Sequence, residues 1–333
     1  MSALSSDPRS MVIDTDGGTD DAVALWWALA DPRVDLVAIT VTWGNVDLTT
    51  AAATVRRVLT AAGRTDVPVA LGAAGPLGPT PLGGLSTHVH GNDGLGGHAA
   101  RWPVGGAATE PLDEPASELL CRLTADRPGE LDVVTIGPLS TLAQALTLDA
   151  SLAGRTRSLT VMGGAVARSG NSLPAGEANV AHDPTAAAAV VTAGWTTPTG
   201  EPPLLVGLDV ALRALYGADD VALADEGRTV AARFLAGPLR TYAEFYARSR
   251  QAPSGDAACH DLLAVLAAVD PTVITEAPVR PLAVDTGGSA AWGATVADLR
   301  TVAQDVLPGF APWRLALAVD APKFLAAFRA LLS

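Results

Sequence analysis

The sequence has few cysteines and no long hydrophobic run. Among its 333 residues, Cys121 and Cys259 are the only cysteines, too few and too far apart for a disulfide framework or a zinc cluster. The longest apolar run, from Ala22 to Ala30, is about half of the ~20 residues that a membrane span needs. The N-terminal segment has no basic flank followed by an apolar stretch, so we expect no secretory signal. These absences lead us to expect a soluble, cytoplasmic, globular protein.

Basic residues are also scarce. Lysine and arginine together number 22 against 35 aspartates and glutamates, which gives a formal net charge of −13. An acidic chain repels nucleic-acid phosphates and anionic lipid surfaces. We therefore expect neither nucleic acid nor a membrane as a partner. Because 49% of the residues are apolar, the chain is long enough to bury a sizeable core.

Short apolar segments recur along the whole chain and indicate buried strands, because most of them are continuous rather than alternating. These segments are Met11 to Ile13, Leu36 to Val41, Val67 to Leu71, Leu131 to Ile136, Leu159 to Met162, Leu204 to Leu208, Val279 to Val284 and Trp313 to Val319. Segments with helical character lie between them: Asp20 to Ala30, Leu48 to Ala62, Pro115 to Ala125, Leu139 to Leu148, Pro184 to Ala193 and Asp261 to Ala268. This alternation predicts an α/β fold with an open, mainly parallel, Rossmann-like sheet and helices on both faces.

Two stretches rich in glycine and proline, Gly72 to Gly84 and Pro198 to Pro203, have the composition of linkers. We interpret both as surface loops, because the polar motifs on either side of them make chemical sense only if they converge. The sequence thus predicts one domain over residues 1–333.

The segment from Asp14 to Asp21, DTDGGTDD, places four carboxylates within eight residues, between an apolar strand and an apolar helix. In an open α/β sheet, ligands bind in the crevice beyond the carboxyl ends of the strands. Acidic residues at a helix start can simply cap it and interact with its dipole. Four carboxylates at this density repel one another, however, and a hard divalent cation with oxygen ligands relieves that repulsion. We therefore favour a metal or catalytic role.

Two motif families compete for this segment and fit it poorly. An EF-hand loop counted from Asp14 needs a glycine at its sixth position and a glutamate at its twelfth, where this chain has Thr19 and Leu25. The DxDGT signature of haloacid-dehalogenase phosphatases differs by one glycine. Those enzymes also use a lysine in mid-chain, whereas the single lysine here is Lys323, close to the C-terminus.

The segment resembles instead the DxDxGxDDAxAL signature of the nucleoside hydrolases, the inosine–uridine preferring N-ribohydrolases. Further motifs of that family follow in the same order along almost the whole chain. They are Ile39 to Val46 (ITVTWGNV), His90 to Gly97 (HGNDGLGG), Ile136 to Leu142 (IGPLSTL), Met162 to Gly164, Gly170-Asn171, Glu177 to Asn179, Asp183-Pro184 and His260-Asp261. Each motif is weak alone, but chance would have to place all of them in order.

The resemblance implies a calcium-dependent enzyme that hydrolyses the N-glycosidic bond of ribonucleosides, giving ribose and a free base. It implies that Asp16, Asp21, Asp261 and the backbone carbonyl of Ile136 bind Ca²⁺. Asp16 would also accept a proton from the attacking water. Asp14 matches a family position outside the metal ligands, so we expect a supporting role for it.

The resemblance also assigns the sugar subsite. Asp20 and Asn179 would hold the ribose hydroxyls, and Glu177 with Asn171 would reach the 5′ end of the sugar. Asn45 would lie near the water or the 2′ hydroxyl. Asn171, Glu177 and Asn179 lie in a loop rich in glycine, serine and proline, where polar residues are normal, so the roles of these three depend on the match and not on residue type.

Two histidines are candidates for the proton donor to the departing base, because histidine can give a proton near neutral pH. His260 and His90 both lie in matched motifs. We favour His260, since Asp261 would fix it near the metal and the sugar, whereas His90 lies in a glycine-rich loop that we expect to close over substrate. For His88 and His182 we expect only a surface or structural role.

Several residues have simpler interpretations or depart from the family pattern. We interpret Cys259 as a packed thiol, and Trp26 with Trp27 as core residues of an apolar helix. Gly17 replaces the usual proline of the acidic loop, and Thr141 the usual asparagine of the GPL turn. Ala178 stands where the family commonly has an aromatic residue beside the sugar, which predicts a roomier ribose pocket.

The main rival hypothesis is a non-catalytic protein of the same fold that binds nucleosides or ribose; a haloacid-dehalogenase-like phosphatase is a distant third. Retention of Asp16 argues against pure binding, because binding alone requires no water activator. The resemblance further implies a homodimer or homotetramer with a small-molecule ribonucleoside as its substrate. The preference for purine or pyrimidine bases stays open.

Overall fold

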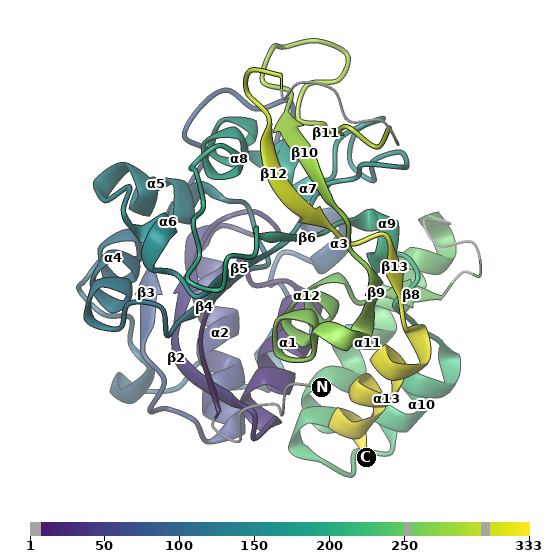
Figure 1. Cartoon of the computed structure of the whole chain (residues 1–333). Coiled ribbons are helices and arrows are strands. Elements are labelled where there is room, and N and C mark those ends of the chain that lie inside the picture. The colour runs from purple at the N-terminus through teal and green to yellow at the C-terminus, as the bar shows by residue number, and fades with distance from the viewer. Residues whose placement is uncertain (1–7, 250–253, 255, 301–306) are drawn as a thin grey trace.

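One large sheet organises the chain. The computed structural model describes residues 8–249, 254, 256–300 and 307–333 (Figure 1). Residues 1–7, part of the segment in which we expect no secretory signal, lie outside this range. Among the described residues, nine strands form the sheet in the order β11-β10-β12-β6-β5-β4-β1-β2-β3. They are β1 (Arg9–Thr15), β2 (Val34–Val41), β3 (Val69–Leu71), β4 (Asp132–Thr135), β5 (Ser158–Met162), β6 (Leu204–Val206), β10 (Val279–Val284), β11 (Thr295–Ala297) and β12 (Ala311–Leu315).

Most of the sheet is parallel, as the sequence predicts. From β3 through β12, each neighbouring pair runs in the same direction. Only β10 departs from this direction, pairing in antiparallel fashion with both β12 and β11. The sheet is open, with β11 at one edge and β3 at the other. The prediction of an open, mainly parallel sheet is therefore confirmed.

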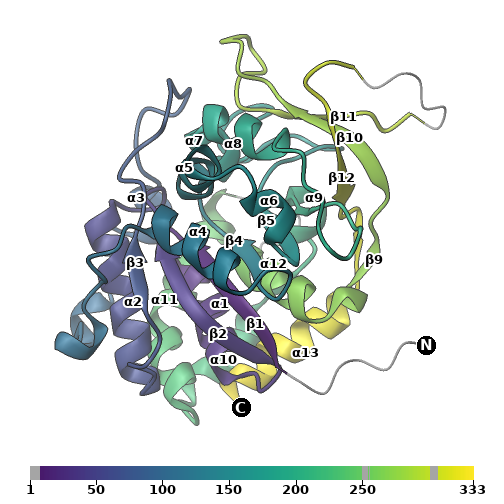
Figure 2. The ribbon, with the colours of Figure 1, turned by 60° about the vertical axis from the view of Figure 1, so that its left-hand side comes forward.

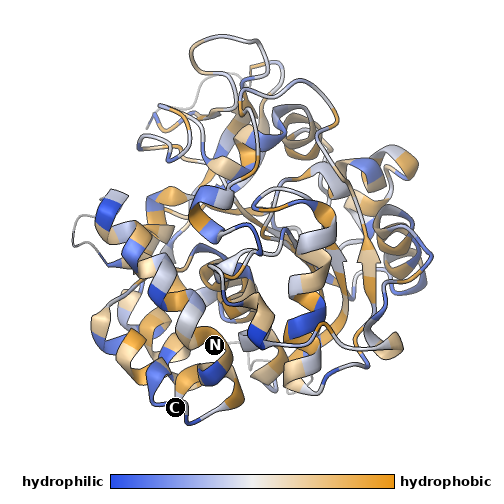
Figure 3. Cartoon of the chain, turned by 180° about the vertical axis from the view of Figure 1, so that it is seen from behind, coloured by the Kyte–Doolittle hydropathy of each residue, from blue (hydrophilic) through white to orange (hydrophobic). Residues whose placement is uncertain are grey.

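Helices cover both faces of the sheet. They are α1 (Thr19–Ala30), α2 (Leu48–Ala62), α3 (Thr87–His90), α4 (Ala116–Asp126), α5 (Ser140–Leu148), α6 (Leu152–Arg155), α7 (Ala178–His182), α8 (Pro184–Val191), α9 (Leu208–Ala211), α10 (Ala218–Asp225), α11 (Val230–Ser249), α12 (His260–Val269) and α13 (Ala321–Leu332). Successive residues of β1 point to opposite faces: Met11 and Ile13 join the cluster with α1, α2, α11, α12 and α13, whereas Val12 joins the cluster with α4, α5 and α8. The strands are mainly orange in Figure 3, and the outer helices show both colours.

Two aspartates, Asp183 and Asp320, cap the N-termini of α8 and α13. The Asp183 carboxylate accepts the N–H of Ala186 at 3.0 Å, with Pro184 in the first turn of α8. Asp320 caps α13 in the same way, accepting the N–H of Lys323 at 3.0 Å. Both carboxylates satisfy a backbone donor that has no partner within its helix.

Two expectations about the elements need correction. The segment Trp313 to Val319 is not one strand: β12 ends at Leu315, and β13 (Ala318–Val319) pairs with β9 (Ile274–Glu276) in a separate sheet. The helix α11 was not expected from the sequence. A second small sheet joins β7 (Leu215–Tyr216) to β8 (Ala257–Ala258), directly before α12.

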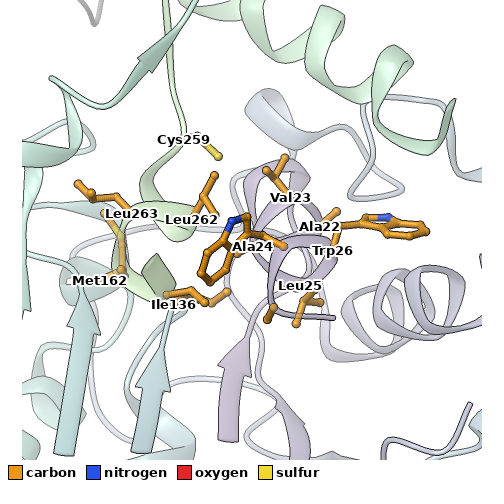
Figure 4. Close-up of a cluster of buried hydrophobic side chains, with 14 of the residues drawn as sticks. Ala22, Val23, Ala24, Leu25, Trp26, Ile136, Met162, Cys259, Leu262 and Leu263 are labelled. Carbon is orange, nitrogen blue, oxygen red and sulfur yellow. The ribbon is translucent and has the colours of Figure 1, made fainter. Parts of the chain in front are cut away.

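The helices α1 and α12 pack against each other, and α12 also packs against β4 and β5. Figure 4 shows Val23 of α1 and Leu262 of α12 in one apolar cluster with Ile136 and Met162. Cys259 is fully buried in the same cluster, and burial raises the pKa of its thiol. The predictions of a packed thiol at Cys259 and of buried Trp26 and Trp27 are confirmed. This packing fixes the N-termini of α1 and α12 side by side.

Among the described residues, no helix combines the length and the apolar character that crossing a membrane requires.

Candidate active site

The acidic loop after β1 folds back onto the first turn of α1. The Asp21 carboxylate accepts hydrogen bonds from the N–H of Gly18 at 2.7 Å and of Asp16 at 3.2 Å, and from the hydroxyl of Thr15. Gly17 has a φ of +74°, and a Cβ there would lie 2.4 Å from the Cα of Ala51. The loop therefore needs glycine at position 17, and its backbone holds the Asp21 side chain in place.

Three buried carboxylates meet where the N-termini of α1 and α12 lie together. Oxygen atoms of Asp20, Asp21 and Asp261 all lie within 4.8 Å of one another, and each residue is at most 4% exposed. Burial, followed by repulsion from Asp21, raises the pKa of Asp20 to about 8. Burial and the neighbouring Asp20 likewise raise the pKa of Asp261. A cluster of oxygen ligands that resists ionisation is suited to a hard divalent cation.

Asp16 lies beside this cluster and is held by Asn45. The Asn45 backbone N–H donates to Asp16 Oδ2 at 2.7 Å, and its Nδ2 donates to Asp16 Oδ1 at 2.9 Å. The same Nδ2 also donates to Asp21 Oδ2 at 3.1 Å. Burial, followed by the Asp21 charge, raises the pKa of Asp16. The loop after β2 thus joins Asp16 to the edge of the carboxylate cluster.

Two of the predicted sugar-binding residues, Glu177 and Asn179, lie at the start of α7. Asn179 donates from Nδ2 to the carbonyl oxygens of Ile136 at 3.0 Å and Met162 at 3.2 Å. Glu177 caps the helix, and its carboxylate accepts the N–H groups of Asn179, Val180 and Gly164 at 2.9 to 3.1 Å. These bonds leave the Oδ1 atom of Asn179 for a ligand, and they show that Glu177 also has a structural function.

The two candidate histidines have different surroundings. The Nε2 atom of His260 lies 2.6 Å from the Tyr246 hydroxyl, while its Nδ1 atom is buried without a hydrogen-bond partner. Burial lowers the pKa of His260 to about 4. The Nδ1 atom of His90 accepts the N–H of Thr19 at 3.1 Å, and burial lowers the pKa of this ring to about 3. His90 is buried as the last residue of α3, directly before the glycine-rich loop, and closure of this segment over substrate stays a prediction.

All predicted site residues except Asp16 and Asp21 line one cavity of about 350 Å³. They are Asp20, Asn45, His90, Ile136, Asn171, Glu177, Asn179, His260 and Asp261. This volume is within the range of small-molecule sites. Asp16 and Asp21 lie next to the cavity floor, linked to it through Asn45.

The cavity has an aromatic side that sequence reasoning missed. Tyr242, Phe245 and Tyr246 of α11 line it, and the Tyr242 ring lies beside the His90 ring, with centroids 5.4 Å apart. Two of the three tyrosines in the chain, Tyr242 and Tyr246, are four residues apart, a spacing that puts both on one helix face. This spacing could have identified the aromatic side of the cavity from the sequence, but only if the helix α11 had been predicted.

Two histidines expected to have no part in the site also line the cavity. His88 packs edge-on against Phe245, with ring centroids 6.1 Å apart. His182 is buried, and its ring nitrogens lie 2.8 Å from the Ala178 carbonyl and 3.3 Å from the Gly84 carbonyl. The structural role expected of His182 is consistent with these contacts, but its place at the cavity wall was not foreseen.

Comparisons with known proteins agree with this geometry. Residues 11–326 match the family model of the inosine-uridine preferring nucleoside hydrolases. A probable uridine nucleosidase 2 of Arabidopsis thaliana is 35% identical over 81% of this chain and 80% of its own length. The inosine-uridine preferring nucleoside hydrolase of Crithidia fasciculata is 31% identical over 95% of each chain.

Solved structures show the same relationship. A plant nucleoside hydrolase superposes with a TM-score of 0.87 at 28% identity, over 98% of this chain and 99% of that structure. A purine-preferring ribonucleoside hydrolase from Gardnerella vaginalis superposes with a TM-score of 0.85, also at 28% identity, over 97% and 98% of the two chains. The sequence match, the fold and the carboxylate-lined cavity together show that this chain belongs to the nucleoside hydrolase family.

Proposed function

We propose that the protein is a calcium-dependent enzyme that hydrolyses the N-glycosidic bond of ribonucleosides to ribose and free base. The observation that carries this proposal is the juxtaposition of buried carboxylates, a hydrogen-bonded His260 and an aromatic wall around one cavity. Cleavage of this bond requires an activated water, a stabilised positive charge at the sugar and a proton for the leaving base. The carboxylates can activate the water and stabilise the positive charge, His260 can supply the proton, and the aromatic wall can contact the base.

The donor set fits a calcium ion. We assign as its ligands Asp16, Asp21, Asp261 and the carbonyl oxygen of Ile136. All four offer hard oxygen atoms, which Ca²⁺ prefers. The Ile136 carbonyl already accepts from Asn179 and keeps a second lone pair for a ligand. When bound, a calcium ion would supply a Lewis acid that polarises a water molecule and the ribose hydroxyls.

Asp16 is the proposed general base. Its two carboxylate oxygens are oriented by the backbone and side chain of Asn45, and it lies next to the cluster rather than at the open mouth of the cavity. Burial raises its pKa, which makes the carboxylate a stronger proton acceptor. The water oxygen bonds to C1′ while one water proton passes to Asp16.

The sugar is held by groups on opposite elements. Asp20 faces the cavity from the start of α1, and Asn179 faces it from α7 with Oδ1 free of the bonds that Nδ2 makes. Both can accept hydrogen bonds from ribose hydroxyls. Asn171 and Glu177 are the proposed partners of the 5′ end, since both line the cavity and Asn171 Oδ1 accepts the N–H of Ala178, the residue after Glu177.

His260 is the proposed proton donor. The bond between its Nε2 atom and Tyr246 fixes the ring, so Nδ1 is the nitrogen left for the departing base. As the bond from C1′ to the base nitrogen breaks, a proton passes from Nδ1 of the His260 imidazolium to that nitrogen, and the ring returns to the neutral form that its lowered pKa favours. His90 is the second candidate, but its Nδ1 atom is already occupied by the N–H of Thr19.

The remaining parts of the proposal depend on composition and on family resemblance. The acidic chain argues against nucleic acid as a partner, and we propose a cytoplasmic homodimer or homotetramer. We keep the binding-only protein as the alternative, because both hypotheses require the same cavity.

Product analysis separates the two. The purified protein is incubated with calcium and a panel of purine and pyrimidine ribonucleosides, and free base and ribose are quantified by chromatography. The proposal predicts equal amounts of base and ribose from at least one ribonucleoside. Saturable binding of the panel with no base released would favour the binding protein instead.

A further inference from the structure

One part of the cavity lining comes from the loop before α3, from α7 and from the loop before α7: Leu82 to Leu85, Asn171, Ser172, Ala178 and His182. We call it the α7 lobe. Ala178 is partly exposed, whereas its neighbours Glu177 and Asn179 are buried. Gly83 and Gly84 are exposed, and a Cβ built on either would meet no atom within 4 Å. Small residues therefore leave open space at this side of the cavity.

The walls of the lobe are held in place by hydrogen bonds between the loop before α3 and the end of α7. The N–H of Leu77 donates to Asp183 at 2.8 Å, and the Thr80 hydroxyl donates to the Ala181 carbonyl at 2.7 Å. His182 contacts the Gly84 carbonyl at 3.3 Å. Residues 181, 182 and 183 each contact the loop before α3. These contacts fix the two walls of the lobe relative to each other.

The stereochemistry of a ribonucleoside points its 5′ carbon at this lobe. The base and the 5′ carbon leave the sugar ring at C1′ and C4′, on either side of the ring oxygen. With the base against the aromatic side chains of α11 and the hydroxyls toward Asp20 and Asn179, the 5′ carbon must face α7. Figures 1 and 2 show α3 between α11 and α7, so that these two helices lie on opposite sides of it.

The chemistry of the α7 lobe selects neutral groups. Leu82, Leu85 and Ala178 are apolar, and the polar members Asn171 and Ser172 are uncharged. Burial lowers the pKa of the remaining polar member, His182, which favours its neutral ring. Among the described residues that line the cavity, none is lysine or arginine, and the Glu177 carboxylate lies beside the lobe. A phosphate group placed here would be desolvated next to a carboxylate without a cationic partner, which is unfavourable.

We propose that the enzyme accepts ribonucleosides that carry a small neutral substituent on the 5′ oxygen, and that the α7 lobe binds this substituent. This inference rests on the proposed function. The Asn171 Oδ1 atom accepts the N–H of Ala178 at 3.1 Å, which leaves its Nδ2 to donate to an ether oxygen at the 5′ position. Water adds at C1′ and the bond to the base breaks, so the products are the 5-O-substituted ribose and the protonated free base. The substituent itself is not cleaved.

The experiment compares three substrates built on one base: the parent ribonucleoside, its 5′-O-methyl ether and its 5′-monophosphate. For the unmodified enzyme with calcium, we expect kcat/KM for the ether within about tenfold of the parent, and for the monophosphate lower by about 100-fold or more. The series Ala178→Ser, Ala178→Leu and Ala178→Phe then fills the lobe stepwise. The ratio of ether to parent should be unchanged for Ala178→Ser and should fall by about tenfold or more for Ala178→Phe.

The outcomes for this inference and for the proposed function are distinct. If the unmodified enzyme hydrolyses the parent but rejects the ether as strongly as the monophosphate, the inference is wrong and the proposed function stands. If the parent itself is not hydrolysed, the proposed function fails. Calorimetric binding of the ether then tests the lobe alone, and a Kd that is unchanged by Ala178→Phe overturns the inference. The comparison of substrates on the unmodified enzyme does not depend on whether any variant folds.

Discussion

The hydroxyl of Tyr246 on α11 lies 2.6 Å from the Nε2 atom of His260 at the start of α12. The other ring nitrogen of His260 is buried and has no hydrogen-bond partner. An unpaired polar atom in a buried position is costly, so its presence in a cavity wall indicates a place for a ligand. The two residues belong to different helices, α11 and α12, and tertiary packing brings them together.

This pair makes the role of His260 testable with two substrates. His260→Ala should slow hydrolysis of natural ribonucleosides by about 10²- to 10⁴-fold, because the departing base loses its proton donor. The same variant should spare p-nitrophenyl riboside, whose leaving group needs no proton. Steady-state kinetics on both substrates measure the difference, and equal losses would show that His260 acts on the sugar or the metal site.

Tyr246→Phe provides a matched variant, because it removes only the hydroxyl that orients His260. We expect a smaller loss on natural ribonucleosides, up to about tenfold, in line with one hydrogen bond. This loss should again be absent with p-nitrophenyl riboside. A Tyr246→Phe enzyme that loses activity equally on both substrates would contradict an orienting role through His260.

The ribose hydroxyls provide a second prediction. If Asp20 and Asn179 accept hydrogen bonds from them, a 2′-deoxyribonucleoside leaves buried polar groups unpaired. Such mismatches can reach factors of ~10⁴ in kcat/KM, so deoxyribonucleosides should be very poor substrates. Comparable kcat/KM values for a ribonucleoside and its 2′-deoxy analogue would refute this assignment.

Much of the sheet and of the acidic site could be predicted because the signals are local. Continuous apolar segments identify parallel strands, and the DTDGGTDD segment carries its own turn and helix start. The convergence of Asp261 with Asp20 and Asp21 could be expected only from resemblance, since the packing of α12 against α1 is a tertiary contact. Hydrophobic pattern alone does not specify which helix is a neighbour.

Helix α11 could not be predicted for a physical reason. It contains the dipeptide Gly237-Pro238, which is a common turn signal because proline lacks the N–H and glycine is flexible. In the structure a Cβ at Gly237 would lie 2.5 Å from the His98 ring, so the glycine serves packing. Since α11 was not recognised, its residues Tyr242 and Tyr246 were missed as well.

Two buried carboxylates, Asp20 of the cluster and Asp14 of β1, predict that the metal-free protein becomes less stable as pH rises through neutrality. Burial raises the pKa of Asp20 to about 8 and of Asp14 to about 7, from an ordinary value of 3.8. The folded state therefore keeps protons that the unfolded chain has released, and stability is lost as pH rises through these values. His90 and His260 have lowered pKa values and act in the opposite sense, but only below their ordinary value of 6.5.

Between pH 6.5 and about 8.5 the carboxylates should therefore dominate. The Tm of chelator-treated protein should fall across this window, and saturating calcium should raise Tm and flatten the slope, since a ligand that binds the folded state stabilises it. Asp20→Asn should reduce the slope of the chelated protein. A chelated protein whose Tm rises across the window would contradict the raised pKa values assigned to these buried carboxylates.

The measurement that tests the central claim most directly is base release from a ribonucleoside by the calcium-loaded protein, the chelated protein and the calcium-loaded Asp16→Asn variant. The account predicts turnover by the first, none by the second, and a loss of about 10²- to 10⁴-fold for the variant. Restoration of activity when calcium is returned to the chelated protein is the control for unfolding. Full activity in a rigorously metal-free sample, or in the Asp16→Asn variant, would contradict the account.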